Sequence, residues 1–124
     1  MGQPQLGITK SVSNIMLGGI QITRPVPGAT AIYMISYSNA GNATADNAVI
    51  YDAIPVNTVY NTNYMIAPGW TAQYSTNVDP SQNYNSSDYS DTYTTKTNIK
   101  WVRWKNASVA IGENGVFIYK VIIK

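Results

Sequence analysis

The sequence predicts an all-β sandwich, built as one domain over residues 1–124. Gly, Pro and Asn divide the chain into short segments that are rich in Val, Ile, Thr and Tyr, as in proteins built of strands. No segment repeats its apolar residues with the 3.6-residue period of a helix. A length of 124 residues suits one compact domain and is too short for two domains joined by a linker.

Short strands are expected, in chain order, at Leu6–Val12, Ile20–Arg24, Thr30–Ser38, Asn47–Ile54, Trp70–Thr76, Asn98–Trp104 and Val116–Ile123. About seven such strands, separated by turn residues, are typical of an immunoglobulin-like sandwich. The first strand and most of the second lie in residues 1–23, where Gly18 and Gly19 suit the tight turn of a hairpin. This region is therefore expected to form an extra apolar N-terminal strand or hairpin.

The connections support this order of strands. Pro25, Pro27 and Gly28 fix a rigid turn ahead of the third strand, and the residues from Asn39 to Asn42 tolerate the positive φ of a corner. The segment 77–97 is dominated by Asn, Ser, Asp, Thr and Tyr, with little apolar alternation. It is expected to be a long surface loop or a weak hairpin.

Two of the expected strands are apolar on both faces. Side chains alternate along a strand, so Ala31, Tyr33, Ile35 and Tyr37 share the core face of the third strand. Phe117, Tyr119, Val121 and Ile123 share one face of the last strand. The outward side chains of these two strands are Ile32, Met34, Val116, Ile118 and Ile122. A free-standing sandwich ordinarily carries polar residues there, and covering one aliphatic side chain stabilises by roughly 1.5–3 kcal/mol. A partner is therefore expected to cover this face.

The composition leaves little chemistry for catalysis. The chain has no Cys and no His, which removes thiolate and imidazole and with them most zinc, haem and iron–sulfur sites. It also removes the Ser–His–Asp and Cys–His arrangements. Six acidic residues are all that remain for carboxylate catalysis. We predict no enzyme, no catalytic residue and no cofactor.

Charge does not indicate a polyanionic partner, because charged residues make up 11% of the chain and the net charge is +2. Basic and aromatic residues interleave in one expected strand, as in surfaces that bind single-stranded nucleic acid. The basic residues are Lys100, Arg103 and Lys105, and the aromatic residues are Trp101 and Trp104. Alternation divides these charges between two faces, however, and no basic groove continues elsewhere. No nucleic-acid partner is predicted.

No apolar run approaches the length that crosses a bilayer, so no membrane span is predicted. The first residues lack the basic and apolar regions of a signal peptide. If the protein is exported, its leader is expected to have been removed or left out of this sequence.

Five stretches resemble a known family when they are taken in order: LGITKSVS at Leu6–Ser13, RPVPGATAIYMISYSNAGNATADNAVIYDAIPVNTVY at Arg24–Tyr60, GWTAQYST at Gly69–Thr76, IKWVRW at Ile99–Trp104 and IGENGVFIYKVIIK at Ile111–Lys124. The family is the repeat module of prokaryotic surface proteins called domain of unknown function eleven. The resemblance covers nearly the whole chain and rests on the order and spacing of strand and turn motifs. It implies an immunoglobulin-like fold, export, tandem stalk repeats or surface-associated modules, and no catalytic residue.

Two departures from the family pattern predict subunit contacts. The outward residues of the third and last strands are apolar where the family often has Thr. The segment 14–23 is also longer and more apolar than usual, and its candidate contacts are Ile15, Leu17, Ile20 and Ile22. This segment either completes the sheet of a neighbouring copy, giving a homopolymer, or covers the apolar outer face of its own domain.

A glycan or surface ligand is the alternative partner. Aromatic side chains stack on sugars beside Asn and Asp groups, and the candidates are Trp70, Trp101, Trp104, Tyr84, Tyr89 and Tyr93. The opposing interpretation is that aromatic residues at strand positions supply the core.

Calcium is a weak further candidate in the segment 77–97. Asn83 and Asn85 offer oxygen ligands there, together with the carboxylates of Asp79, Asp88 and Asp91. Their spacing is not that of an EF-hand. The same residue types are required by turns, so a plain polar loop is the other interpretation.

Sites of covalent modification are the last candidates. Asn42, Asn85 and Asn106 open glycosylation sequons and are expected at turns. Lys10 is the only first-strand Lys that suits a Lys–Asn isopeptide crosslink, but the last strand offers no Asn opposite it and Asn114 falls in a turn, so no crosslink is expected.

Taken together, these features predict a structural module of an extracellular filament, sheath or cell-surface stalk. It is expected to assemble with copies of itself, or with neighbouring repeats, through strand pairing and apolar contacts. The alternative is an adhesive module that binds glycans or a host surface.

Overall fold

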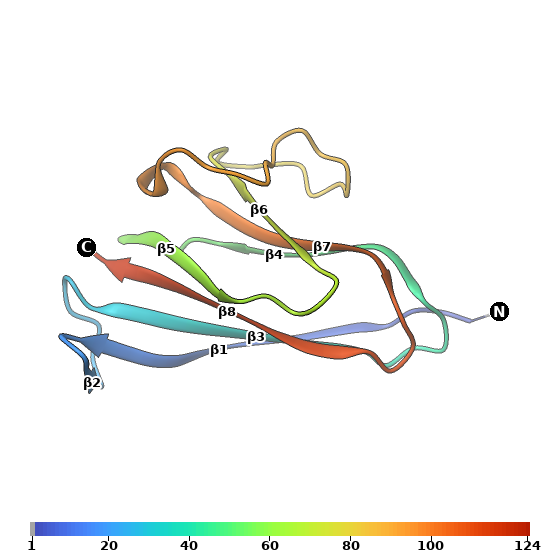
Figure 1. The fold of residues 1–124 in the computed structure, drawn as a ribbon, viewed down its shortest axis with the longest axis horizontal. Coiled ribbons are helices and arrows are strands. Elements are labelled where there is room, and N and C mark those ends of the chain that lie inside the picture. Colours follow the sequence, from blue (N-terminus) through green and yellow to red (C-terminus); the bar gives the residue numbers. More distant parts are fainter. Residues whose placement is uncertain (1) are drawn as a thin grey trace.

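The protein is a β-sandwich of two antiparallel sheets, shown by a computed structural model that describes residues 2–124 (Figure 1). The strands are β1 (Leu6–Leu17), β2 (Ile20–Ile22), β3 (Thr30–Asn39), β4 (Ala45–Ala53), β5 (Thr58–Met65), β6 (Thr71–Ser75), β7 (Trp101–Val109) and β8 (Asn114–Ile123). One short 3₁₀ helix, η1, spans Lys96–Asn98. The predicted all-β sandwich is confirmed.

The strand order differs from that of an immunoglobulin constant domain. One sheet has the order β2-β1-β3-β8-β5 and the other β4-β7-β6; we call them the five-stranded and three-stranded sheets. If β2 is set aside and the remaining strands are lettered A to G along the chain, the sheets are A-B-G-D and C-F-E. Constant domains have A-B-E-D and C-F-G. The fifth and seventh strands have therefore exchanged places.

All seven expected segments overlap observed strands, but one strand was missed. The segment Thr58–Met65 forms β5 at the edge of the five-stranded sheet. Its pairing with β8 shifts register between Tyr60 and Thr62 and again between Asn63 and Met65. These two irregularities break the alternation of apolar and polar residues from which a strand is predicted.

Aromatic side chains fill the space between the sheets. Trp104 from β7 and Phe117 from β8 are completely buried, and their rings stack with centroids 4.7 Å apart. Trp70 is also buried, and its indole N–H donates to the hydroxyl of Tyr37 over 2.9 Å. The core faces predicted for β3 and β8 are confirmed, since Ala31, Ile35, Tyr37, Phe117, Tyr119 and Val121 are all buried.

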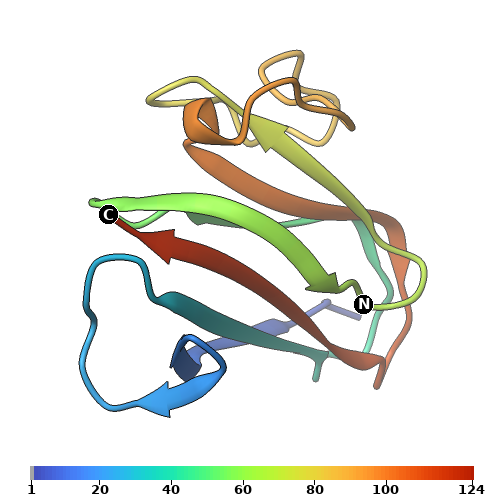
Figure 2. The same ribbon diagram turned by 60° about the vertical axis from the view of Figure 1, so that its left-hand side comes forward.

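The segment 77–97 is the predicted long loop, and it forms a third layer. It lies over the outer face of the three-stranded sheet (yellow to orange in Figure 2). Tyr74 of β6 and Ser90 of the loop exchange two backbone hydrogen bonds of 2.9 Å. The loop is therefore fastened both to the edge and to the face of this sheet.

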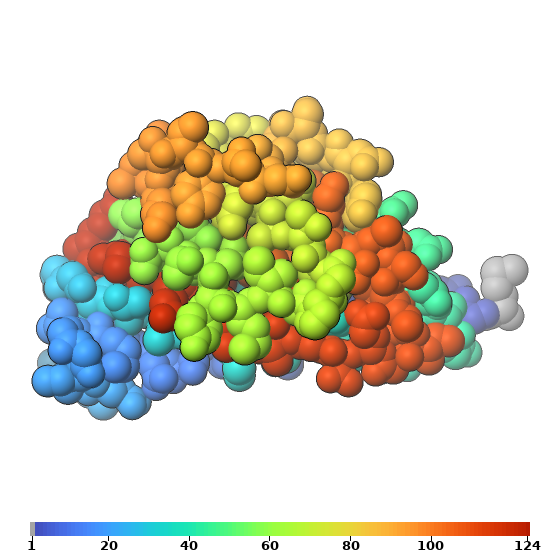
Figure 3. All heavy atoms as spheres, viewed as in Figure 1, coloured from blue at the N-terminus to red at the C-terminus, as the bar shows by residue number. Residues whose placement is uncertain are grey.

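The N-terminal region forms a hairpin within the plane of the five-stranded sheet. Gly18 and Gly19 have φ values of 59° and 80°, as a two-residue primed turn requires. The turn pairs Ile15 with Ile22 and Leu17 with Ile20. Figure 3 shows this hairpin, in blue, projecting from one corner of the molecule. In this single chain the region therefore pairs with itself at the sheet edge, and it does not fold across the sheet.

Candidate functional site

The main candidate site is the outer face of the five-stranded sheet, the side turned away from the three-stranded sheet. Ile32 and Met34 of β3 lie on it beside the outward residues of β8, and Met34 is directly opposite Ile118. Within the described residues, the three-stranded sheet packs on the other face and the loop 77–97 on the far side of that sheet. The outer face comprises Met16, Ile32, Met34, Val59, Val116, Ile118 and Ile122.

These side chains shield one another only in part. Each of them is half-buried, neither in the core nor fully exposed. Met16 and Val59 were not among the predicted contacts, because Met16 lies beyond the strand end that was expected and β5 was missed. Pairing places Val59 directly opposite Ile122. Lys120 also points outward from β8, between Ile118 and Ile122 and opposite Ile32. Its ammonium lies over the ring of Tyr64, 4.5 Å from the ring centroid, and brings one positive charge to this face.

The other four predicted contacts lie on the opposite side of the sheet. Ile15 is opposite Ala31 of β3, which faces the core, and Ile22 is opposite Ile15. Leu17 and Ile20, one pair further on, share this side and are 42% and 68% exposed. The nine predicted contacts therefore do not form one surface. The cause is the irregularity between Val12 and Asn14, because it puts Ile15, and with it Leu17, in phase with the core face of β3.

A small polar cluster closes one open side of the sandwich. The Lys10 ammonium of β1 lies 2.7 Å from a carboxylate oxygen of Asp52 in β4, and the Tyr119 hydroxyl donates to the same oxygen over 2.5 Å. Burial raises the pKa of Tyr119, and the neighbouring carboxylate raises it further. Lys10 thus meets a carboxylate rather than an Asn, and no Lys–Asn pair of the isopeptide type involves it.

The loop 77–97 is held by a buried cation that the sequence did not single out as structural. Arg103 of β7 is completely buried. Its guanidinium donates to the carbonyl oxygens of Asn83 and Tyr84, over 2.9 and 3.2 Å, and its Nε donates to the side chain of Gln73 over 2.9 Å. The Tyr89 ring lies 4.0 Å from the guanidinium carbon. Burial lowers the pKa of Arg103, while Tyr89 opposes that shift.

The predicted aromatic platforms are used mainly inside the protein. Trp70 and Trp104 belong to the core, and Tyr89 is buried against Arg103. The Trp101 indole donates to the backbone of Val78. Tyr84 lies under the Lys105 ammonium. Tyr93, at 39% exposure, packs edge-on against Tyr60 and Tyr74 and keeps one side toward solvent.

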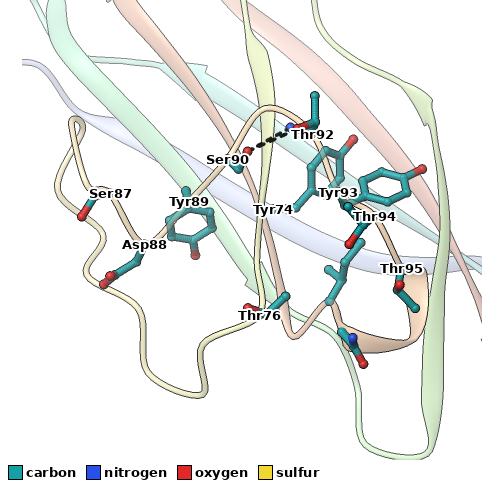
Figure 4. A pocket seen from close by; sticks show the side chains of 12 residues that line it. Tyr74, Thr76, Ser87, Asp88, Tyr89, Ser90, Thr92, Tyr93, Thr94 and Thr95 are labelled. Atoms are coloured by element: carbon teal, nitrogen blue, oxygen red, sulfur yellow. Dashed lines mark hydrogen bonds between the residues drawn. The ribbon is translucent and has the colours of Figure 1, made fainter.

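A shallow pocket lies beside Tyr93, between the loop and the end of β6 (Figure 4). Its volume is about 310 Å³, and its walls carry hydroxyl side chains with the rings of Tyr74 and Tyr93. Ser90 and Thr92 hydroxyls lie 3.4 Å apart at its rim. Hydroxyl groups next to an aromatic ring are suited to hydrogen-bonding and stacking with a small polar ligand.

The acidic residues that were candidate calcium ligands make separate contacts and do not converge on one point. Asp88 accepts a hydrogen bond from the backbone of Ser81 over 2.7 Å, and Asp91 accepts one from Gln73 over 2.7 Å. Asp79 is exposed. In residues 2–124 no group of three or more His, Cys, Asp or Glu side chains is arranged to hold a metal ion.

The three sequons occupy different environments. Asn42 and Asn85 are exposed in loops, as predicted. Asn106, expected at a turn, instead lies inside β7 opposite Ala48, because this strand continues past Trp104 to Val109. Its amide nitrogen lies against Gly69, so a sugar there would meet the neighbouring turn.

Comparison with known protein families, with curated proteins and with solved structures finds no match for this chain. Among the described residues there is no helix with the length and apolar character needed to cross a membrane.

Proposed function

We propose that this protein is a structural module that self-assembles at a prokaryotic cell surface, in a filament, sheath or stalk. A second copy covers the outer face of the five-stranded sheet. The extracellular location and the kinship with domain of unknown function eleven belong to this proposal and rest on the sequence resemblance given above.

The apolar outer face is the observation that carries the proposal. The two sides of the sandwich differ: the loop 77–97 covers the three-stranded sheet, whereas no described segment covers the five-stranded one. Loss of the solvent contact of adjacent Ile, Val and Met side chains is favourable in proportion to the area buried. Two such faces pack sheet on sheet, about 10 Å apart, with interdigitating side chains.

The size of this face suits association with another protein. Four strands about 4.8 Å apart and about 30 Å long give a projected area on the order of 500 Å². Stable interfaces bury about 800 Å² on each partner, and the accessible area of a side-chain surface exceeds its projection. Apart from Lys120, the side chains named for this face are apolar, which favours an apolar partner, as a second copy provides.

Electron microscopy of the purified protein at rising concentration tests the proposal. We expect pairs of copies, and longer assemblies where a second contact joins the pairs, that grow in number with concentration. Both should disappear when Ile118 is replaced by Lys, which would place an additional charge in the contact. The control is Ile111→Lys, in a turn where the side chain is already 58% exposed. Isolated single particles at all concentrations would contradict self-assembly.

Glycan binding is the second candidate, supported by the pocket beside Tyr93. That pocket combines hydroxyl groups with a partly exposed ring, as expected of a sugar subsite. A glycan array tests this. A signal that is lost in Tyr93→Ala and kept in Tyr64→Ala, which changes an exposed ring elsewhere, would support adhesion, and no signal from the unmodified protein would contradict it.

A further inference from the structure

The N-terminal hairpin carries four aliphatic side chains that the outer-face contact does not use. Ile15, Leu17, Ile20 and Ile22 lie on the core side of the five-stranded sheet. Leu17 and Ile20 are exposed, and the other two are half-buried. An apolar sheet face is normally buried against a second layer. A partner is therefore expected on the core side of the hairpin.

The hairpin is uncovered because the two sheets differ in width. Contacts between aromatic rings set β6 opposite β5 and β7 opposite β8. Asp52 of β4 contacts Tyr119 of β8 and Lys10 of β1, so β4 lies opposite β3. The five-stranded sheet therefore extends past β4 by two strands, β1 and β2, which we call the overhang. In Figures 1 and 2 the hairpin of the overhang lies apart from the three-stranded sheet.

The side chains of β1 alternate as if a second layer continued beyond β4. Thr9 and Ser11 face the outer side, where they are exposed. Ile8 and Val12 face the core side, yet they are 50% and 52% exposed. Polar residues on one face and apolar residues on the other are typical of a sheet with one covered face. The pattern indicates that the core side of the overhang is covered when the protein is assembled.

We infer that the overhangs of two copies pack on each other, core side against core side, around a two-fold axis parallel to the strands. This rotation places the overhang of the second copy beside β4, in the layer of the three-stranded sheet. That sheet is narrower by the same two strands, so each copy completes the second layer of the other. The inference deepens the proposed function and rests on it, because it names a second contact of the same assembly.

The axis fixes which residues meet. It sets β1 of one copy over β2 of the other, at the same height along the strands. Leu17 pairs with Ile20 within one hairpin, and Ile15 pairs with Ile22. Across the contact, Leu17 of each copy therefore faces Ile20 of the second copy, and Ile15 faces Ile22. Sheets that pack in this way lie about 10 Å apart, with interdigitating side chains.

A second copy fits this surface in width and in charge. Residues 11–23 carry no charge, so two identical hairpins meet without like-charge repulsion. The contact is small, since two strands about 4.8 Å apart and about 30 Å long project at most on the order of 300 Å². A stable interface buries about 800 Å² on each partner. We therefore expect this contact to be the weaker one and to join pairs that the outer face already holds.

The overhang contact and the outer-face contact lie on opposite sides of one sheet. Each is self-complementary and joins two copies. Copies joined alternately by the two contacts extend as an open chain, unless the two axes close on each other. The overhang contact thus supplies the second connection that a filament needs beyond a simple dimer.

Chemical crosslinking of the full chain tests the inference, since the sequence has no Cys. Ile20→Cys places a thiol in the contact, where a short bismaleimide can bridge two copies across one layer of side chains. The matched control is Gln21→Cys, the next residue of the same strand, which is also exposed and points to the opposite side. We expect at least about tenfold more crosslinked dimer from Ile20→Cys. Equal crosslinking, or more from Gln21→Cys, would overturn the inference.

A second substitution separates specific packing from random collision. Leu17→Thr removes apolar area opposite Ile20 and keeps a residue that favours strands. Added to Ile20→Cys, it should lower crosslinking about fivefold, while the circular dichroism spectrum stays that of the folded protein. Unchanged crosslinking would contradict the predicted pairing of Leu17 with Ile20.

The size of the assemblies distinguishes the two contacts. Leu17→Thr with Ile20→Thr should leave pairs of copies and remove the longer assemblies. If the longer assemblies persist in this variant, the inference fails and the outer-face proposal survives. If they persist instead when Met34 and Ile118 are both replaced by Thr, while Ile20→Cys still crosslinks selectively, the outer-face proposal fails and the overhang contact stands.

Discussion

Replacing Met34 and Ile118 by Thr should weaken self-assembly strongly while leaving the fold intact. The two side chains lie opposite each other in the middle of the outer face, and both are half-buried in the single chain. At most about a third of each side chain is left to cover, so burial is worth no more than about 1 kcal/mol per side chain. Two substitutions in each of two copies therefore remove no more than about 4 kcal/mol. The dissociation constant should rise by up to about 1,000-fold.

The monomer should lose much less stability. Thr favours strands, and its hydroxyl would face water, so the free energy of unfolding should fall by about 1 kcal/mol or less per substitution. Sedimentation velocity over a concentration series gives the dissociation constant, and urea unfolding gives the stability. The matched control replaces Val56 and Ile111 by Thr, since these are apolar residues 88% and 58% exposed away from the face. Equal dissociation constants for the two double variants, or an unfolded Met34/Ile118 variant, would refute the reasoning.

Three further outcomes are expected. Arg103→Met should lower the free energy of unfolding by about 2–4 kcal/mol. It removes three hydrogen bonds of a charged group, worth about 1.5–3 kcal/mol each, and it also removes the cost of burying the guanidinium, several kcal/mol, which offsets part of that loss. Limited proteolysis should then cut first between residues 77 and 97, and unchanged cleavage would show that the loop is held by other contacts. Burial raises the pKa values of Tyr60 and Tyr119 above their ordinary value of 10.0. Their contribution to stability is therefore complete below about pH 10 and is lost as the pH rises beyond it, since the unfolded chain ionises first. Unfolding by urea at about pH 9 and pH 11, with phenolate absorbance, checks this, and equal stability at both would contradict it. EDTA should leave the melting temperature unchanged, because the carboxylates of the described residues form no cluster that could hold a metal ion. A clear drop in the melting temperature would indicate that the protein binds calcium.

Strand periodicity predicted most of the fold. The two faces of β3 and β8 were separable from sequence because a run such as Thr30–Ser38 alternates without interruption, and its core residues are indeed buried. β5 was not predicted, because its two register shifts break the alternation of apolar and polar residues. The order of strands within the sheets was not predictable, since it depends on contacts between residues far apart along the chain.

The candidate site was predicted in part, because alternation shows which residues of one strand share a face but not how two strands pair. The outward residues of β3 and β8 were identified correctly as one face. The hairpin residues from Ile15 to Ile22 were joined to that face only because they are apolar, and pairing places them on the other side. The structural role of Arg103 was not predicted, because no local sequence pattern shows that a loop twenty residues away supplies carbonyl groups to its guanidinium.

The most direct test of the account is the solvent exposure of Ile methyl groups, measured by NMR with a soluble paramagnetic probe at low and high protein concentration. Ile32, Ile118 and Ile122 should be accessible in the dilute protein and become protected as concentration rises. Ile50, which is buried, and Ile111, which is exposed, should not change. Protection of the three outer-face methyls even at the lowest concentration, or their full exposure at the highest, would contradict the claim that a second copy covers this sheet.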